Sequence, residues 1–436
     1  MTVTGTGEPV TQAVPERVSL ERYADEWLPR FADSGAGNAL VKAQLEVASF
    51  YGADAMVRVS SSHVMGDMEV LGRSGKQFID GCADEKIRVA VPTTTNARCV
   101  DFSFSTRLRQ PESFVADEKS LRESLAELGL LLTDTCTNYQ TVSQPRFGEH
   151  VAWGDTGAVI YANSIMGARS NFESGPAALA AGVTGYTPMY GFHLDERRRP
   201  THEIHVSCPL RGLSDWGALG AVIGEAFPGY WNVAEITVGQ DDITGDKLKH
   251  LGASLASYGS QAMFHVRGAT PEARSVDATS ALGLPVLEVD RDDLDAIYGR
   301  FGGVAASGGP EIHVDVVAFT APQLSLFELQ DVAERLRGRR VNDATKLIIT
   351  TSPTTRDSLE RLGLLAALNE AGAWVLSGVC LYLMDMPQMA KAFGWETIAT
   401  NSAKLANIVG GYRLDPLLLS TADAIEAAVT GRVAHG

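Results

Sequence analysis

The sequence predicts an α/β fold of two or three lobes, built on mainly parallel sheets. Short apolar runs of strand length alternate with amphipathic or alanine-rich stretches of helix length along most of the chain. A chain of 436 residues is too long for one core and long enough for several. Hydrophobic residues make up 45% and charged residues 21%, which is a globular composition.

Charge, cysteine spacing and hydropathy exclude several classes of function. The formal net charge of −16 disfavours nonspecific binding to nucleic acid or anionic lipid, because phosphate contacts need clustered Lys and Arg. No apolar run reaches membrane-spanning length, and no cleavable leader is expected. The five cysteines are far apart without a CxxC pair, which favours reduced thiols. We therefore expect a soluble cytoplasmic protein that binds neither nucleic acid nor membrane.

The first half of the chain predicts a tail and one lobe. Residues 1–18 lack an apolar pattern and predict a mobile tail, whereas residues 19–210 predict a first α/β lobe that carries most of the site loops. The expected strands of this lobe are 55–59, 87–91, 158–162 and 203–206, and the expected helices are 40–52, 74–83, 120–132 and a segment that begins after 175.

The second half predicts two further segments. Residues 211–310 predict a second α/β lobe, and residues 311–436 predict a third segment that returns to the active site. Asp215 is the expected N-cap of a helix, and 305–310 is an expected connecting loop. The expected strands are 233–238, 262–266, 286–289, 312–319, 346–351, 374–379 and 397–400, and the further helices are 247–258, 291–301, 356–371 and 421–430.

Polar side chains gather where several predicted strands end. Ser60 to His63 follow the first strand of the lobe, and Asn163, Ser164 and Arg169 follow the run at 158–162. Ligands bind at the carboxyl ends of strands in open α/β sheets, and Arg can hold a carboxylate or phosphate through two hydrogen bonds. From residue types alone, an ordinary turn with a surface arginine explains this stretch as well as an anion site does.

Long stretches of the sequence resemble the aconitase X family. Residues 145–200 contain GEHVAW, ANSIMGARSN, GPAALAA and TGYTPMYGFHLDERRRP, which match a hallmark run of that family. The resemblance extends from about residue 38 to residue 433 through SSHVMGD, VPTTTN, DTCTNY, DWGALG, FHVRGATPEA, APQLS, TNSAK and VTGRV. It implies an aconitase-like catalytic core and a hydro-lyase that dehydrates a small hydroxylated acid, since relatives act on cis-3-hydroxyproline or mevalonate 5-phosphate.

The resemblance also implies which residues form the site. The implied catalytic residues are Ser61, His63, Ser402 and Lys404. The implied substrate-binding residues are Glu149, His150, Asn163, Ser164, Arg169, Asn171 and Asn401. We expect Arg169, Asn401 and Lys404 to share a cavity beside two cysteines, and we expect Arg169→Ala to abolish turnover with little loss of stability.

The metal ligands that the family implies are only partly present. Relatives hold an iron–sulfur cluster through three cysteines, and the resemblance places two of them at Cys136 and Cys380. Ala321 stands at the third position, and Gln323 replaces a neighbouring histidine. Alanine has no lone pair, so the usual three-thiolate set is incomplete.

Three interpretations of this change stay open. A mononuclear iron could be held by the two cysteines together with Asp134 or His63. A replacement thiolate could complete a cluster, from Cys82, Cys99 or Cys208. Otherwise the site holds no metal, and the two cysteines are small buried residues.

The resemblance leaves the partner and the reaction open as well. Relatives carry a swivel domain that closes over the site, and we expect no such domain in this chain, so a separate small subunit could supply it. The leading hypothesis is the large subunit of a dehydratase. The alternatives are a lyase or isomerase of specialised metabolism that works without a cluster, and a non-catalytic binding subunit.

Overall fold

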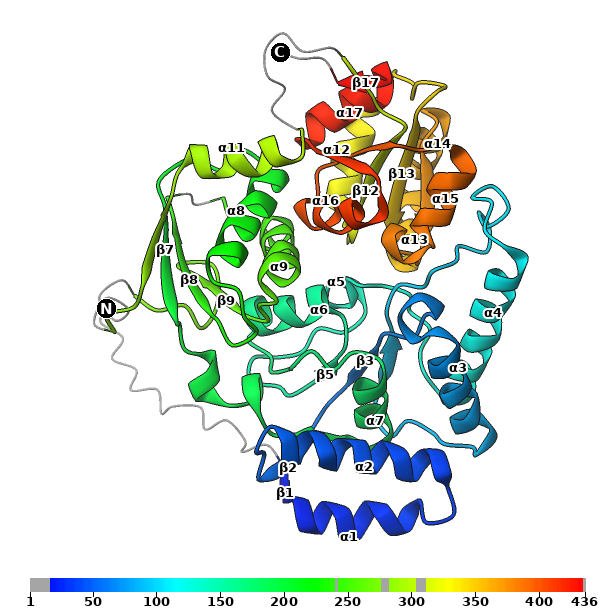
Figure 1. Ribbon diagram of the computed structural model, residues 1–436, viewed down its shortest axis with the longest axis vertical. Helices are drawn as coiled ribbons and strands as arrows, with labels where there is room; N and C mark the ends of the chain where they lie inside the picture. Colours follow the sequence, from blue (N-terminus) through cyan, green and yellow to red (C-terminus); the bar gives the residue numbers. More distant parts are fainter. Residues whose placement is uncertain (1–15, 240–241, 276–281, 303–310, 434–436) are drawn as a thin grey trace, which may run out of the picture.

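The structure is a computed structural model that describes residues 16–239, 242–275, 282–302 and 311–433. Its elements form three α/β lobes, and the predicted α/β class with mainly parallel sheets is confirmed (Figure 1). The loop expected at 305–310 and residues 1–15 of the expected tail lie outside the described residues. Arg17–Ser19 forms strand β1, so the expected tail does not extend to residue 18.

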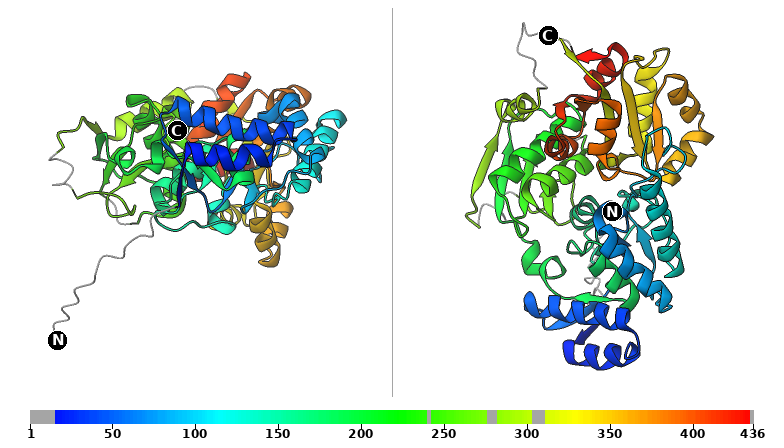
Figure 2. Two further views of the ribbon diagram at one scale, coloured as in Figure 1. Left: turned by 90° about the horizontal axis from the view of Figure 1, so that it is seen from below. Right: turned by 45° about the vertical axis from the view of Figure 1, so that its right-hand side comes forward.

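The first lobe contains two small sheets. Strand β2 (Ala55–Arg58) lies between β1 and β6 (Tyr186–Pro188) in an antiparallel sheet. Strand β3 (Ser62–Val64) lies between β4 (Thr93–Thr95) and β5 (Ala152–Trp153) in a parallel sheet. Figure 2 shows two of the lobe's helices, α1 and α2, side by side at its outer edge. The helices of the lobe are α1 (Leu20–Arg30), α2 (Gly35–Phe50), α3 (Met68–Asp84), α4 (Glu112–Glu127), α5 (Asn138–Thr141), α6 (Thr156–Tyr161) and α7 (Pro176–Thr184).

The second lobe is a parallel sheet with the strand order β10-β7-β8-β9. Because β7 precedes residue 211, this sheet begins before the boundary that the sequence suggested. The strands are β7 (His202–Val206), β8 (Ala234–Val238), β9 (Phe264–Val266) and β10 (Val286–Val289), and the helices are α8 (Leu213–Ala226), α9 (Gly245–Gly259) and α11 (Arg291–Arg300).

The third lobe is a parallel sheet with the order β14-β13-β12-β15-β16. Its central strand, β12 (Val316–Leu324), is buried along its whole length. The other strands are β13 (Lys346–Thr351), β14 (Trp374–Ser377), β15 (Thr397–Thr400) and β16 (Asp415–Leu418), with the short antiparallel pair β11 (Ile312–His313) and β17 (Arg432–Val433). The helices are α12 (Leu326–Leu336), α13 (Pro353–Arg361), α14 (Leu364–Glu370), α15 (Met386–Phe393), α16 (Ala403–Val409) and α17 (Thr421–Thr430).

One predicted strand is wrong, and the error affects the site. The run at 158–162 lies in helix α6, which continues into the π-helical turn η1 (Ala162–Met166). Asp155 caps this helix, because its side chain accepts the N–H of Ala158 at 2.9 Å. A short apolar run has no decisive period, so its type could not be settled from hydrophobicity alone.

Three further elements differ from prediction. Residues 87–91 do not pair as a strand, whereas Thr93–Thr95, expected in a turn, forms β4. Asp215 lies inside the first turn of α8 and binds the side chain of Arg291 instead of capping. The helix expected at 356–371 is divided at Gly363, which has a left-handed φ of 72°.

The first and third lobes are held together across their sheet ends. They share one hydrophobic core, in which Leu125 of α4 and Leu376 of β14 are members. The guanidinium of Arg98 donates to the carbonyl of Ser377 at 3.0 Å, and the Asp101 carboxylate accepts the N–H of Ser377 at 2.8 Å. In Figure 1 the third sheet accordingly lies directly above β3 and β5.

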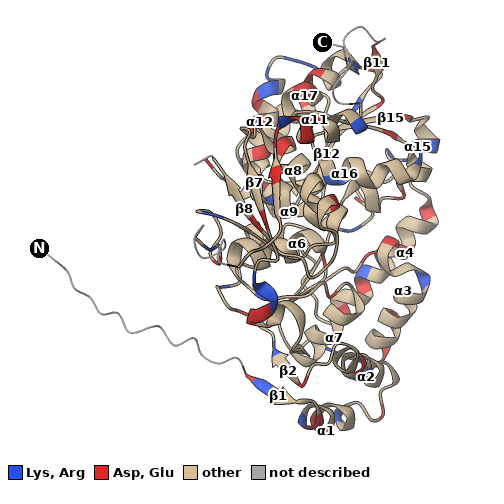
Figure 3. Cartoon of the chain, turned by 60° about the vertical axis from the view of Figure 1, so that its left-hand side comes forward, with Lys and Arg blue, Asp and Glu red and all other residues tan. Residues whose placement is uncertain are grey.

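Acidic and basic residues are interspersed over the outer helices, as α3 and α4 show (Figure 3). No helix of the described part of the chain is long and apolar enough to cross a membrane. The expectation of no nucleic-acid partner rests on the net charge alone and stays a prediction.

Candidate active site

The carboxyl ends of strands from two lobes meet at one place. His63 lies on β3, and the turn that carries Cys136 is joined to β4 by a hydrogen bond from Thr135 N to Thr95 O at 3.3 Å. From the third lobe, β12 brings Gln323, whose N–H donates to Cys136 Sγ at 3.4 Å. Strand ends of parallel sheets are where α/β proteins bind ligands, so this junction is the candidate active site.

Two thiols lie at the junction, and both are buried. Cys380 follows β14, and its Sγ lies 3.9 Å from the hydroxyl of Thr320. Burial raises the pKa of the Cys136 thiol, and the negative charges of Asp155 and Cys380 raise it further. Burial raises the pKa of Cys380 to about 11, and the charge of Lys404 opposes this shift. Both side chains are therefore thiols at neutral pH, and they lie close enough together to influence each other.

His63 is a neutral imidazole, and only one of its nitrogens makes a well-aligned hydrogen bond. Its Nδ1 is hydrogen bonded to the hydroxyl of Thr94 at 2.8 Å. Complete burial lowers its pKa to about 4, and the nearby Asp155 and Asn96 oppose the shift without reversing it. Its buried Nε2 makes no well-aligned hydrogen bond with the described residues, although the Asn96 side chain and the Thr135 backbone lie close enough to raise its pKa. A neutral imidazole with a nitrogen in this state can accept a proton.

Other buried polar atoms around His63 and Cys136 also lack partners. A buried polar atom without a partner costs about 1–3 kcal/mol, so native proteins keep few of them. Of the sixteen such atoms among the described residues, six belong to this junction: Nε2 of His63, both amide atoms of Asn96, both amide atoms of Asn138 and Oε1 of Gln323. Amide groups that can donate and accept suit a small polar ligand such as a hydroxylated acid.

Lys404 brings a positive charge to the thiols. It lies near the start of α16, is 7% exposed, and its charge lowers the pKa of both Cys136 and Cys380. Its Nζ lies 5.7 Å from the centre of the Tyr382 ring. Burial raises the pKa of the Tyr382 hydroxyl, and the two cysteines add to that shift, so Tyr382 lies near the thiols.

Two predicted catalytic serines are engaged in structural hydrogen bonds. The hydroxyl of Ser61 accepts the indole N–H of Trp153 at 3.2 Å. The hydroxyl of Ser402 donates to the carbonyl of Ala321 at 2.6 Å and accepts the N–H of Leu405 as the cap of α16. Ser402 therefore positions the chain beside the thiols. Of the four predicted catalytic residues, the structure brings His63 and Lys404 to the junction without a well-aligned hydrogen bond to the described residues at His63 Nε2 or at the Lys404 ammonium.

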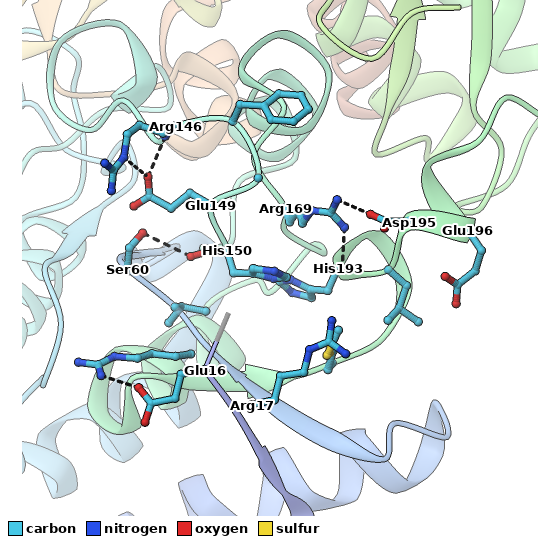
Figure 4. Close-up of a pocket in the computed structure, with 16 residues that line it drawn as sticks. Glu16, Arg17, Ser60, Arg146, Glu149, His150, Arg169, His193, Asp195 and Glu196 are labelled. Carbon is cyan, nitrogen blue, oxygen red and sulfur yellow. Dashed lines mark hydrogen bonds and ion pairs between the residues drawn. The ribbon is translucent and has the colours of Figure 1, made fainter. Parts of the chain in front are cut away.

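Arg169 lies in a different pocket, which neither Cys136 nor Cys380 lines. This pocket of about 730 Å³, here called the arginine pocket, is formed by the β1–β2 edge and the turns at 146–150 and 189–196. Figure 4 shows the Arg169 guanidinium turned to Asp195, with which it pairs, and to the carbonyl of His193 at 3.0 Å. The expectation that Arg169 shares a cavity with the cysteines is therefore wrong, because its guanidinium is held elsewhere.

The other predicted substrate-binding residues of the arginine pocket are paired as well. The Nδ1 atoms of His150 and His193 are hydrogen bonded at 2.9 Å, and the rings are stacked. Burial lowers the pKa of His150 to about 2 and that of His193 to about 3, so both rings are neutral. Glu149 lies 3.7 Å from the guanidinium of Arg146 and accepts its backbone N–H. These groups largely satisfy one another, although the buried Nε2 of His193 has no hydrogen-bond partner among the described residues and lies 4.0 Å from the Glu173 carboxylate.

The remaining predicted residues stabilise the π turn or a separate cleft. The Asn163 amide donates to the carbonyls of Ser170 and Ala262, both at 2.9 Å. Ser164 accepts the N–H of Phe264 at 3.0 Å, and Asn171 accepts that of Phe192 at 3.1 Å. Asn401 donates to Thr421 Oγ1 at 3.0 Å and lines a cleft of about 260 Å³ beside α12, not the arginine pocket. Asn401 and Arg169 thus lie apart from each other.

Sequence reasoning did not assign roles to several residues that line the junction. Asn96 stood in a turn after the predicted strand at 87–91, Asn138 stood in a turn after the predicted helix at 120–132, and Gln323 was marked only as a departure from the family. Tyr382 gave no signal, because an isolated tyrosine after a strand is common. Their importance depends on missing hydrogen-bond partners, which the sequence does not reveal.

A cluster held by three protein ligands does not fit the donor atoms of this pocket. Two thiols are present, but the buried side chain at the third position is the methyl group of Ala321. Among the described residues no group of three or more His, Cys, Asp or Glu side chains is placed to hold a metal ion. Cys99 cannot serve as a replacement, because its thiol donates to Glu118 at 3.1 Å.

Comparison with known proteins shows the family. Models of the aconitase X first, second and third domains match residues 18–196, 200–299 and 314–430. The phosphomevalonate dehydratase large subunit of Methanothermobacter thermautotrophicus is 32% identical over 397 residues, which cover 89% of this chain and 94% of that protein. The cis-3-hydroxy-L-proline dehydratase of Pseudomonas aeruginosa is 30% identical, over 92% of this chain and 68% of that protein.

A solved structure agrees with this assignment. The crystal structure of Thermococcus kodakaraensis aconitase X in its holo-form superposes with a TM-score of 0.81 and 28% identity, over 93% of this chain and 98% of that one. The structural match confirms the predicted fold, and the named relatives, which are dehydratases, confirm the predicted class of reaction for the family. The chain is a member of the aconitase X family.

Proposed function

We propose that the protein is the large subunit of a dehydratase that removes water from a small hydroxylated carboxylic acid. The relatives named above dehydrate phosphomevalonate or cis-3-hydroxy-L-proline, which share a hydroxyl group and a carboxylate. The observation that carries the proposal is the junction itself, where polar atoms of His63, Asn96 and Asn138 that make no well-aligned hydrogen bond with the described residues lie around two thiols and Lys404.

His63 and Lys404 are the groups that we assign to proton transfer. The Nε2 atom of His63 takes the proton from carbon as the C–H bond breaks. The C–O bond breaks at the neighbouring carbon, and Lys404 gives its proton to the leaving oxygen, which departs as water. The product is an unsaturated acid, and the two side chains return to their starting states by proton exchange with solvent. The unpaired amides would orient the acid, and orientation of this kind accounts for a large share of catalysis.

We infer that a small subunit completes the enzyme. The Methanothermobacter relative is called a large subunit, and the match covers 68% of the Pseudomonas relative, so about a third of that protein lies outside it. An additional module over the junction would exclude water from the acid and the proton-transfer groups. Reduced thiols at all five described cysteines agree with a cytoplasmic location, which we include in the proposal.

A direct assay tests the proposal. The purified chain, with and without the small subunit encoded with it, would be incubated with a series of small hydroxylated acids, including phosphorylated and cyclic ones. Nuclear magnetic resonance would follow the loss of the C–H proton and the appearance of the alkene proton. We expect one acid of the series to be dehydrated. Tight binding without turnover under every condition would favour a binding subunit instead.

A further inference from the structure

Gln323 joins the two turns that carry the thiols. Its side-chain Nε2 donates to the carbonyl of Asp134 at 3.3 Å and to that of Val379 at 3.1 Å. Its backbone N–H donates to the sulfur of Cys136 at 3.4 Å. Asp134 and Val379 precede Cys136 and Cys380 by two residues and by one. One fully buried residue of β12 therefore fixes both thiol-bearing turns.

Ala321 lies on the same strand, two residues before Gln323. Its carbonyl accepts the hydroxyl of Ser402, and its backbone is left-handed with a φ of 55°. Its side chain is buried, and it offers no donor atom to a metal. As described above, the donor atoms around the two thiols do not make a set of three.

We infer that this junction works without a three-thiolate iron–sulfur cluster, and that Gln323 holds the two thiol-bearing turns in the place where a cluster would connect them. A cluster bound to three segments is a covalent crosslink between them. Two hydrogen bonds from a buried amide are a weaker crosslink, but they connect the same two turns. This inference rests on the proposed function only in taking the junction as the active site.

The first test restores the missing thiolate. Ala321→Cys keeps a Cβ at the same position, so it adds no new backbone strain at the left-handed residue. Ala321→Ser is the matched control, because it has a similar size without a soft sulfur ligand. Each protein would be purified without oxygen and supplied with ferrous iron and sulfide. Bound iron, bound sulfide and the visible sulfur-to-iron absorption would then be measured.

We expect the wild type and Ala321→Ser to bind neither iron nor sulfide in stoichiometric amount, and Ala321→Cys to gain both. Stoichiometric iron and sulfide in the wild type, lost on Cys136→Ser, would overturn the inference. A folded Ala321→Cys protein that gains nothing would overturn it too, because the third thiolate would not be the missing part. If Ala321→Cys fails to fold, the measurement on the wild type decides alone.

The second test concerns the crosslink. Gln323→Leu keeps the approximate volume and removes both donors, so we expect the Tm to fall by about 2–6 °C. The control is Gln330→Leu, at an exposed position of α12, for which we expect no change. In the cluster-loaded Ala321→Cys background, Gln323→Leu should cost less, because the cluster connects the turns. Equal Tm values for Gln323→Leu and Gln330→Leu would contradict the inference.

Activity separates this inference from the proposed function. Dehydration by iron-free protein supports both. Folded, iron-free protein that dehydrates none of the acids contradicts the proposed function and leaves the inference about the cluster intact. Dehydration that requires both bound iron and bound sulfide contradicts only the inference.

Discussion

The junction of the sheet ends and the arginine pocket contain similar residue types, but their polar atoms are satisfied to different degrees. Both hold buried imidazoles and positive charges. In the arginine pocket Arg169 is bound to Asp195 and His150 is bound to His193, and among the buried polar atoms of these groups only Nε2 of His193 lacks a hydrogen-bond partner in the described part of the chain. At the junction, His63 Nε2 and the Asn96 amide make no well-aligned hydrogen bond with the described residues. Residue type alone does not distinguish a binding site from a structural network. The distinction lies in whether the polar atoms are already satisfied.

The difference has a physical basis. Satisfied polar groups stabilise the fold and lose that stabilisation when a ligand displaces their partners. Unsatisfied buried groups destabilise the fold until a ligand binds them, so they favour binding. Substitutions at the junction should therefore reduce activity more than stability, and substitutions in the arginine pocket should do the reverse.

The largest effect is expected at His63. His63→Asn removes Nε2, and loss of a positioned base lowers kcat by about 10²–10⁴-fold. Because the pKa of His63 is lowered to about 4, the base form persists down to that pH. The acid limb of the wild-type kcat/KM profile should therefore lie near pH 4, below the usual range of histidine. The control is His313→Asn on the exposed edge strand β11. Full activity of His63→Asn would show that the base is another group.

A smaller effect is expected at Lys404. Lys404→Met keeps most of the side-chain volume and removes the charge, so kcat should fall by about 10²–10³-fold. The change leaves the Tm nearly unaffected if Lys404 acts on the substrate. Lys391→Met on α15, an exposed position, is the matched control and should leave both quantities unchanged. A fall in Tm without a fall in kcat would assign Lys404 to structure.

The sequence predicted the architecture well. One wrong secondary-structure prediction, however, misplaced half of the expected site residues. Runs such as 346–351 and 397–400 are apolar, bounded by polar turns and buried, so pattern and structure agree. A strand at 158–162 would have brought Asn163 and Arg169 to the sheet ends beside His63. The Asp155 cap makes that run a helix, and the chain then carries Arg169 to the arginine pocket.

The unpartnered amides show a second limit of prediction. A buried asparagine or glutamine is satisfied or unsatisfied according to atoms contributed by distant segments. Gln323 contacts residues 189 and 56 positions away, and no local pattern indicates such contacts. Long shared motifs therefore suffice to assign a functional family, whereas the atoms that bind the ligand are identified only from the structure.

The buried histidines of the arginine pocket predict a pH effect on stability. Burial lowers the pKa of His193 to about 3, whereas an unfolded histidine has a pKa of about 6.5. Between these values the unfolded state binds the extra proton, so this group destabilises the fold as pH falls below 6.5. The contribution approaches about 1.4 kcal/mol per pH unit.

His193→Asn should therefore weaken the loss of stability on acidification. The free energy of unfolding would be measured in urea between pH 7 and pH 4 for the wild type and the variant. Other groups titrate in the same window, so the difference between the two slopes is the informative quantity. His313→Asn, which alters an exposed imidazole, should keep the wild-type slope. An unchanged slope in His193→Asn would mean that this ring is not held neutral by burial.

The smallest effect is expected at Arg169. Substitution of this residue tests the comparison between the junction and the arginine pocket most directly. Arg169→Ala removes the hydrogen bond to the carbonyl of His193 and the ion pair with Asp195. The Asp195 side chain is 81% exposed, so the ion pair adds little, and we expect a loss of about 1 kcal/mol in the free energy of unfolding. We expect kcat to stay at the wild-type value, in contrast to the expectation from sequence.

Asp195→Ala separates the two roles that Arg169 could have. If the guanidinium serves the fold, Asp195→Ala and Arg169→Ala both leave kcat unchanged, and their double variant loses no more stability than the sum of the single ones. If the guanidinium instead holds an acid, removal of Asp195 frees it, and turnover or KM changes in that variant while stability does not. If Arg169→Ala loses turnover while its stability is unchanged, Arg169 contacts the substrate. The arginine pocket and the junction would then form one functional site.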